Sequence, residues 1–204
     1  MRVQYIDFKN KADKIIAFIG LIITSPLLII TAITIKLDSA GPIIFKQMRL
    51  GLHGKPFYMY KFRSMYVGAE KKGVYNRKGD PRVTPVGRFI RKTCIDELPQ
   101  LINVLKGEMS LIGPRPALTY HPWPYEEYSK EQKKMFLVKP GITGWAQVNG
   151  RKEVEWNRRI EMNVEYVHKM SLLFDIKILI KTIVKVIKME GNLNTKETVK
   201  PGGH

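Results

Sequence analysis

A long apolar segment lies near the start of the chain, and shorter, more polar segments follow it. Residues 15–35 hold 21 positions without a charge. At about 1.5 Å per residue, a helix of this length can cross a bilayer. Ser25 and Pro26 lie near its centre, where the N–H group that proline lacks predicts a break or a kink. We therefore expect a membrane helix interrupted at these two residues.

Basic residues flank this segment on both sides. They are Arg2, Lys9, Lys11 and Lys14 before it, and Lys36, Lys46 and Arg49 after it. A spanning helix would carry one basic flank across the bilayer, whereas positive charge prefers the cytoplasmic side. A re-entrant hairpin keeps both flanks on that side, and Ser and Thr hydroxyls can bond to the carbonyls that proline leaves unpaired. The residues favour re-entry, with a spanning helix or a soluble core helix as alternatives.

A second membrane-type pattern covers residues 172–189. Lys177, Lys181, Lys185 and Lys188 recur at helical spacing, and apolar residues fill the other positions. Such a helix is typical of a membrane interface rich in anionic lipids. The alternative is a core helix with a solvated lysine face.

The middle of the chain predicts a small α+β domain. Two apolar runs, residues 43–49 and 57–63, flank a glycine-containing loop and predict a β-hairpin. Its second strand ends in the basic residues Lys61 and Arg63. Residues 86–94 predict a short helix that carries Arg88 and Arg91.

Adjacent carboxylates, Asp96 and Glu97, begin a predicted helix of about three turns. Pro99 suits the first turn of a helix, and Gly107 suits its end. The unpaired N–H groups of a helix start favour negative charge and can hold a phosphate. Taken alone, however, such a pair is most often an ordinary helix cap.

The neighbours of this pair indicate phosphate chemistry. Cations shortly precede it, and two stiff Gly/Pro-rich loops follow it with Arg115 and Arg151. The predicted ligands of the substrate phosphates and nucleotide are Lys61, Arg63, Arg88, Arg91, Arg115 and Arg151. Adjacent carboxylates repel each other unless a cation lies close, and Mg²⁺ binds carboxylate and phosphate oxygens together. One carboxylate could then attack phosphorus while the arginines stabilise the developing charge. Transfer from a diphosphate donor to a membrane phosphate uses all of these features.

Composition agrees with an anionic partner. The 204 residues carry 35 Lys and Arg against 18 Asp and Glu, a net charge of +17. This charge suits nucleic acid, an anionic lipid surface or a phosphorylated substrate. The usual nucleic-acid-binding motifs are missing from the sequence, so we expect no nucleic-acid partner, and a membrane-tethered nucleic-acid-binding protein is only the lesser alternative. Cys94 is the only cysteine, which excludes an internal disulfide.

Ordered motifs along the chain resemble those of the monotopic phosphoglycosyl transferases, also called bacterial sugar transferases. The matching stretches are Ser25 with Pro26, and residues 36–42, 60–65, 80–84, 87–91, 96–100, 105–116 and 138–150. The chain is similar to the short form of this family. The resemblance implies a re-entrant helix and an active site on the cytoplasmic face of the bacterial inner membrane.

The resemblance also implies a ping-pong mechanism. Asp96 would attack the β-phosphate of a UDP-sugar, release UMP and hold a phospho-sugar. The phosphate of a polyprenol phosphate, such as undecaprenyl phosphate, would then accept that group, as the first membrane step of glycoconjugate synthesis. Glu97, with Asp96, would bind Mg²⁺. Residues 144–151 are similar to members that use N-acetylated amino-sugar donors.

Two positions depart from the family pattern. Met135 and Phe136 stand where members often carry Arg-His, and Asn163 stands where members carry Asp. These departures motivate the alternative of a non-catalytic membrane scaffold. We expect a membrane helix over 1–38, a catalytic domain over 39–190 and a tail over 191–204. The sequence does not name the sugar, the prenol, the pathway or the oligomeric state.

Overall fold

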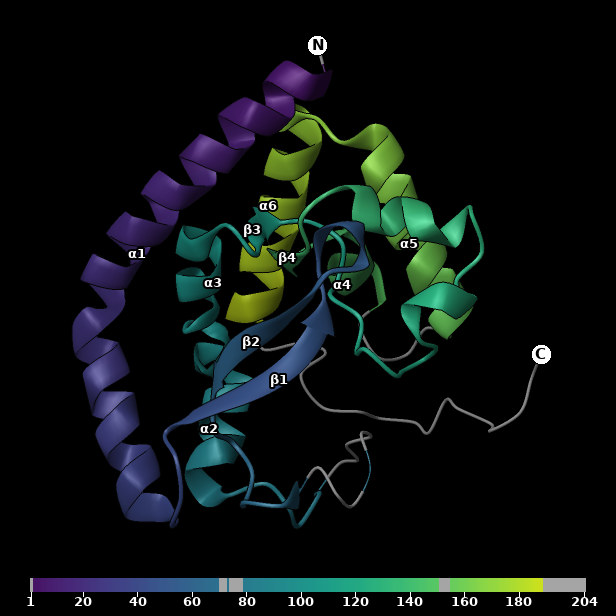
Figure 1. Ribbon diagram of the computed structural model, residues 1–204. Coiled ribbons are helices and arrows are strands. Elements are labelled where there is room, and N and C mark those ends of the chain that lie inside the picture. Colours follow the sequence, from purple (N-terminus) through teal and green to yellow (C-terminus); the bar gives the residue numbers. More distant parts are fainter. Residues whose placement is uncertain (1, 70–72, 74–78, 151–154, 189–204) are drawn as a thin grey trace.

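The computed structural model describes residues 2–69, 73, 79–150 and 155–188 (Figure 1). Its first element, α1 (Arg2–Asp38), is a single helix of 37 residues along one side of the molecule. The helix is long and apolar enough to cross a membrane, and most of its large apolar side chains are exposed. The sequence-based prediction of a long apolar helix is therefore confirmed.

Helix α1 continues through Pro26 as one curved helix, so the predicted division into two helices is wrong. Proline lacks the N–H that would bond to the carbonyl of Ile22. The Ser25 hydroxyl donates to that carbonyl instead, at 2.8 Å. The Thr24 hydroxyl donates to the carbonyl of Gly20 at 2.6 Å. Because the Ser25 hydroxyl compensates for the missing donor, the helix passes the proline without ending.

Both halves of α1 pack against the rest of the domain. Near its start, the Tyr5 hydroxyl and the Lys9 ammonium lie 2.7 and 2.8 Å from the carboxylate of Asp175, in helix α6 (Leu172–Ile187). Near its end, Ile35 is buried against Phe62. The helix is thus tied to one domain close to each of its ends.

The predicted hairpin is confirmed. Strands β1 (Ile44–Leu50) and β2 (Pro56–Phe62) pair antiparallel and are joined by the 3-10 turn η1 (Leu52–Gly54). The buried amide of Asn103 accepts from the N–H of Tyr60 at 3.0 Å and donates to the carbonyl of Tyr58 at 2.7 Å. Because Asn103 lies in α3, these bonds fix β2 beside that helix.

The remaining elements are α2 (Pro85–Lys92), η3 (Ile95–Glu97), α3 (Gln100–Lys106), β3 (Ser110–Ile112), η4 (Tyr125–Glu127), η5 (Gln132–Leu137), β4 (Gly141–Thr143), α4 (Trp145–Gly150), α5 (Trp156–Lys169) and α6 (Leu172–Ile187). Helix α2 confirms the predicted short helix, and Gly107 ends α3 with a left-handed φ of 78°. Strands β3 and β4 pair in parallel. A Cβ atom at Gly113 would lie 2.8 Å from the nitrogen of Gly141, so only glycine permits this approach of the two loops.

The predicted C-terminal helix is confirmed as α6, but its lysine face has neighbours within the fold. Lys177 and Lys181 lie over the ring of Trp145 in α4, at 5.7 and 5.0 Å from its centroid. The exposed apolar residues of this helix include Leu173 and Ile187, which are 80% and 73% exposed. A membrane-facing surface on α6 would therefore be apolar, with the lysines beside it.

Candidate active site

Asp96 and Glu97 lie in the short 3-10 turn η3 and not in the first turn of an α-helix. Helix α3 begins only at Gln100 and has seven residues, so the predicted three-turn helix is too long. Cys94 precedes the turn with a left-handed φ of 59°, a conformation that strains a side chain with a Cβ atom. The left-handed conformation of Cys94 turns the chain after α2, and the turn η3 with both carboxylates begins at the next residue.

Lys61 reaches Glu97 from strand β2. Its ammonium lies 2.8 Å from Oε1 of Glu97, and both side chains are largely buried. The bonds from Asn103 hold β2 next to α3, which explains why a strand residue meets a turn 36 positions later. The Lys61 ammonium therefore lies beside the carboxylate pair. The spacing of these residues in the sequence could not show this contact.

Burial dominates the protonation of Asp96. It raises the pKa of the Asp96 carboxyl to about 6, and the charge of Glu97 also raises this pKa. The charges of Lys61 and Arg91 oppose this rise. At neutral pH the carboxylate form predominates, in a setting with less water than usual. Such a group is suited to nucleophilic attack.

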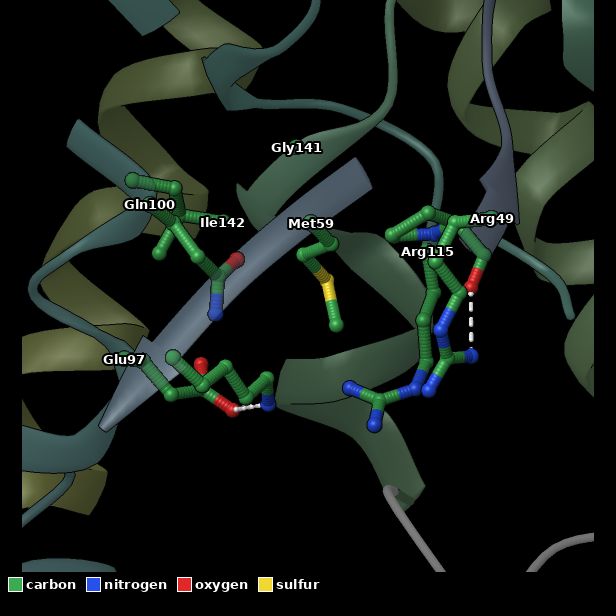
Figure 2. Close-up of a pocket in the computed structure, with 9 residues that line it drawn as sticks. Arg49, Met59, Glu97, Gln100, Arg115, Gly141 and Ile142 are labelled. Carbon is green, nitrogen blue, oxygen red and sulfur yellow. Dashed lines mark hydrogen bonds and ion pairs between the residues drawn. The ribbon is translucent and has the colours of Figure 1, made fainter. Parts of the chain in front are cut away.

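Arg115 faces the same region from the stiff loop after β3. It lines a pocket together with Lys61, Glu97 and Gln100. Figure 2 shows Arg115 on the side of this pocket opposite Glu97. The backbone N–H of Arg115 donates to Oδ1 of Asn163 in α5, at 3.1 Å. The pocket thus has the Glu97 carboxylate on one side and a guanidinium on the other, and Asp96 is the neighbour of Glu97 in the chain.

Arg63 has a different role from the one predicted. Its side chain is buried, and its guanidinium donates to the carbonyls of Pro42 and Ser39 and to the Ser39 hydroxyl, at 2.6–2.7 Å. These bonds tie the end of α1 to the hairpin. The predicted assignment of Arg63 as a phosphate ligand is therefore not supported by its surroundings, and we leave it out of the proposed site.

The other predicted cations are spread more widely. Arg91 is partly buried and acts electrostatically on Asp96, while Arg88 is exposed on α2. Neither lines the pocket of Arg115. Arg151 lies outside the described residues.

Arg49 is the functional candidate that sequence reasoning missed. It lies in β1 and lines the same pocket as Arg115. In the sequence it was only one of the cations that flank the apolar segment. Its pairing partner across the hairpin is Phe57, and its strand also bridges to Leu118, two positions after Pro116. That non-local contact, which brings Arg49 to the Arg115 loop, has no signal in the local sequence.

The carboxylates fit a magnesium ion only in combination with a substrate. Among the described residues, no group of three or more His, Cys, Asp or Glu side chains could hold a metal. Mg²⁺ is, however, commonly bound by one or two carboxylates together with substrate phosphates and water. Asp96 and Glu97 meet that requirement. Lys61 already offsets part of their repulsion, so the repulsion by itself does not demand an ion.

The family departures have structural explanations. Met135 and Phe136 are buried in a core cluster with Tyr128, where Phe136 makes an edge contact at 5.2 Å. Their apolar side chains fill space and do not reach the pocket of Arg115. Asn163 supplies the acceptor for the Arg115 backbone. The structure therefore assigns Asn163 a contact with the site, although the sequence analysis left it out.

Known proteins similar to this chain are sugar transferases. The family model for bacterial sugar transferases matches residues 4–189. The uncharacterized sugar transferase EpsL of Bacillus subtilis (strain 168) is 47% identical over 185 residues, which cover 90% of this chain and 89% of that protein. The UDP-glucose:undecaprenyl-phosphate glucose-1-phosphate transferase of Escherichia coli (strain K12) is 45% identical over 87% of this chain and 39% of its own length.

A third relative has a different sugar in its name. The undecaprenyl-phosphate galactose phosphotransferase of Salmonella typhimurium is 41% identical over 90% of this chain and 41% of its own length. The chain thus spans about two fifths of the Escherichia and Salmonella proteins. The match to the family model extends over the apolar helix α1, the hairpin and the carboxylate turn alike. The chain belongs to the bacterial sugar transferase family.

Proposed function

We propose that this chain is a phosphoglycosyl transferase. It moves a phospho-sugar from a UDP-sugar to a polyprenol phosphate and releases UMP. The observation that carries the proposal is the half-buried Asp96 carboxylate next to Glu97, whose ion pair with Lys61 lines a pocket together with Arg115. The names of the Escherichia and Salmonella relatives support undecaprenyl phosphate as the acceptor.

In the first step, an oxygen of Asp96 attacks the β-phosphorus of the donor. A P–O bond forms to Asp96, and the bond from that phosphorus to the bridging oxygen breaks. UMP leaves with that oxygen and the electron pair. Arg115 and Lys61 offset the negative charge that develops on the phosphoryl oxygens. The pKa of about 6 leaves Asp96 ionised and ready for this attack at neutral pH.

In the second step, a phosphate oxygen of the polyprenol phosphate attacks the same phosphorus. The P–O bond to Asp96 breaks, and the carboxylate is restored. The product is a polyprenyl diphosphate sugar. Since the acceptor supplies an ionised phosphate oxygen, this step does not require a general base.

Mg²⁺ would be held by Glu97 and Asp96, and it would neutralise charge on the diphosphate of the donor. Glu97 is then a metal ligand, positioned by Lys61. The names of the relatives include glucose and galactose, and an N-acetylated amino-sugar donor stays a prediction from residues 144–151.

The way in which α1 is held supports the proposed membrane arrangement. A helix that crosses a bilayer places its two ends on opposite sides. In this chain Lys9 pairs with Asp175, and Ser39, just after the helix, bonds to Arg63, so both ends contact polar groups of one domain. We therefore include in the proposal that α1, although continuous, is re-entrant: it enters the membrane as one curved helix, and its two ends, together with the active site, face the cytoplasm at the inner membrane.

The test is release of UMP by the full chain in detergent or nanodiscs, supplied with Mg²⁺, undecaprenyl phosphate and a panel of UDP-sugars. We expect one or more donors to yield UMP, and Asp96→Asn to abolish it. Glu126→Gln, an exposed carboxylate in η4, serves as the control and keeps its turnover. A wild-type chain without UMP release from any donor would instead favour the membrane-scaffold alternative.

A further inference from the structure

Arg49 is held in the pocket by neutral acceptors. Its Nη1 donates to the carbonyl of Pro116 at 3.0 Å, and its Nη2 donates to Oε1 of Gln47 at 2.6 Å. Neither acceptor carries a charge. These bonds therefore orient the guanidinium beside Arg115 without neutralising it.

The charge of Arg49 is poorly compensated. Within the described residues its guanidinium makes no ion pair, and its buried Nε has no hydrogen-bond partner. Burial and the neighbouring charge of Arg115 lower the pKa of Arg49 to about 9. A buried cation is costly unless an anion or a full set of acceptors is present. This cost indicates that the pocket is built to receive an anion.

Two other arginines, the partly buried Arg82 and the buried Arg63, show what structural compensation looks like in this fold. Arg82 contacts both carboxylate oxygens of Asp80. All three guanidinium nitrogens of Arg63 donate hydrogen bonds to oxygen acceptors of the chain. Arg49 has neither a carboxylate contact nor a full set of acceptors, so fold stability alone does not account for it.

We propose that Arg49 is a substrate-binding residue that, with Arg115, forms a two-guanidinium clamp for the diphosphate of the nucleotide donor. The inference rests on the proposed function and names two residues that hold its donor. A diphosphate presents two adjacent phosphoryl groups, and the planar guanidinium binds phosphate oxygens in a fork. Two phosphoryl groups would neutralise both arginines at once.

The placement of the two arginines suits this role. Figure 2 shows Arg49 and Arg115 on the side opposite Glu97. A donor held by both guanidiniums would present its phosphorus toward the turn that carries Asp96 and Glu97. The clamp therefore holds the donor, while the carboxylates on the other side carry out the chemistry.

The test compares binding of UDP, UMP and uridine to the full chain in detergent, by calorimetry. The variants are Arg49→Gln and Arg49→Lys, and the matched control is Arg158→Gln, an exposed arginine on α5. Because hydrogen bonds to charged groups are among the stronger ones, Arg49→Gln should weaken UDP binding by about tenfold or more. Arg49→Lys keeps the charge but loses the fork, so its loss should be smaller. Uridine binding and the control should stay unchanged.

Melting temperatures without ligand show which variants are folded. If Arg49→Gln does not fold, the UDP affinity of Arg49→Lys tests the clamp by itself. UDP affinity equal to wild type in a folded variant would overturn the clamp, as would an equal loss for uridine and UDP. The clamp can fail in this way while UMP release by the wild type continues. Loss of the proposed function itself would appear as a wild-type chain that releases no UMP.

Discussion

The ammonium of Lys61 lies 2.8 Å from Oε1 of Glu97 and joins strand β2 to the turn that carries Asp96. Lys61→Met removes this cation, leaves Glu97 without its ion pair and takes away a charge near Asp96. Loss of one electrostatic partner in an active site typically reduces turnover by about 100-fold or more, and we expect a fall of that order in UMP release.

The control for Lys61 is Lys106→Met. Lys106 is exposed and donates to the hydroxyl of Tyr60, the residue before Lys61, but it does not line the pocket. Its variant should keep turnover close to wild type. Equal activity in the two variants would contradict a catalytic contribution from the Lys61–Glu97 pair.

Asn163 should act by positioning Arg115. Its Oδ1 accepts from the Arg115 backbone, and the side chain is buried. Asn163→Leu leaves that N–H without its acceptor, which costs about 1–3 kcal/mol, and we expect the KM for the donor to rise by roughly tenfold. Asn163→Asp keeps an acceptor oxygen and should restore most of the affinity. If Asn163→Leu and Asn163→Asp had the same KM for the donor, the positioning role would be excluded.

The raised pKa of Asp96 has a consequence for stability. Its pKa is about 6 in the folded chain against a usual 3.8, so the folded state binds the proton more tightly. Folding stability is therefore highest below about pH 4 as far as this group is concerned, and it declines as pH rises toward 6. Asp96→Asn removes the buried charge, and at pH 7 it should raise the free energy of unfolding by about 1–3 kcal/mol.

The measurement is a melting temperature at pH 7 in EDTA, without substrate. Asp80→Asn is the matched opposite case, because the Arg82 guanidinium lowers the pKa of Asp80. Ionised Asp80 stabilises the fold above its usual pKa, and that stability is lost as pH falls through the lowered value. Asp80→Asn should therefore lower the melting temperature. An Asp96→Asn variant less stable than wild type would contradict the assigned protonation.

The two ends of α1 should be accessible from one side of the membrane. In a Cys94→Ser background, Lys11→Cys and Lys46→Cys place single thiols at exposed positions before and after the apolar segment. A membrane-impermeant maleimide should label both in inverted vesicles and neither in intact spheroplasts. Labelling of the two positions from opposite sides would show a spanning helix.

Local sequence patterns predicted the elements, whereas non-local contacts determined the site. The hairpin, helix α2 and the stop at Gly107 depend on near neighbours, and their positions could be predicted. The 3-10 turn at Asp96 depends on the left-handed Cys94, which has no marker in sequence. Arg49 and Arg63 look alike as sequence cations, yet packing sends one into the pocket and the other to the end of α1.

Pro26 is a second case in which the residue type alone does not determine the structure, here within a single helix. The residue type predicted a break, but the structure has a continuous helix because the neighbouring Ser25 hydroxyl bonds to the carbonyl that proline leaves unpaired. Proline does disfavour a continuous helix, but the hydrogen bond from Ser25 is what keeps α1 continuous here.

The central claim is that Asp96 carries the phospho-sugar. The most direct measurement is the mass of the full chain after incubation with Mg²⁺ and an active UDP-sugar, without polyprenol phosphate, followed by peptide mapping. We predict a mass increment of one phospho-sugar on the peptide that contains Asp96, its loss on addition of polyprenol phosphate, and no increment in Asp96→Asn. An increment on another residue, or UMP release by Asp96→Asn at the wild-type rate, would contradict the account.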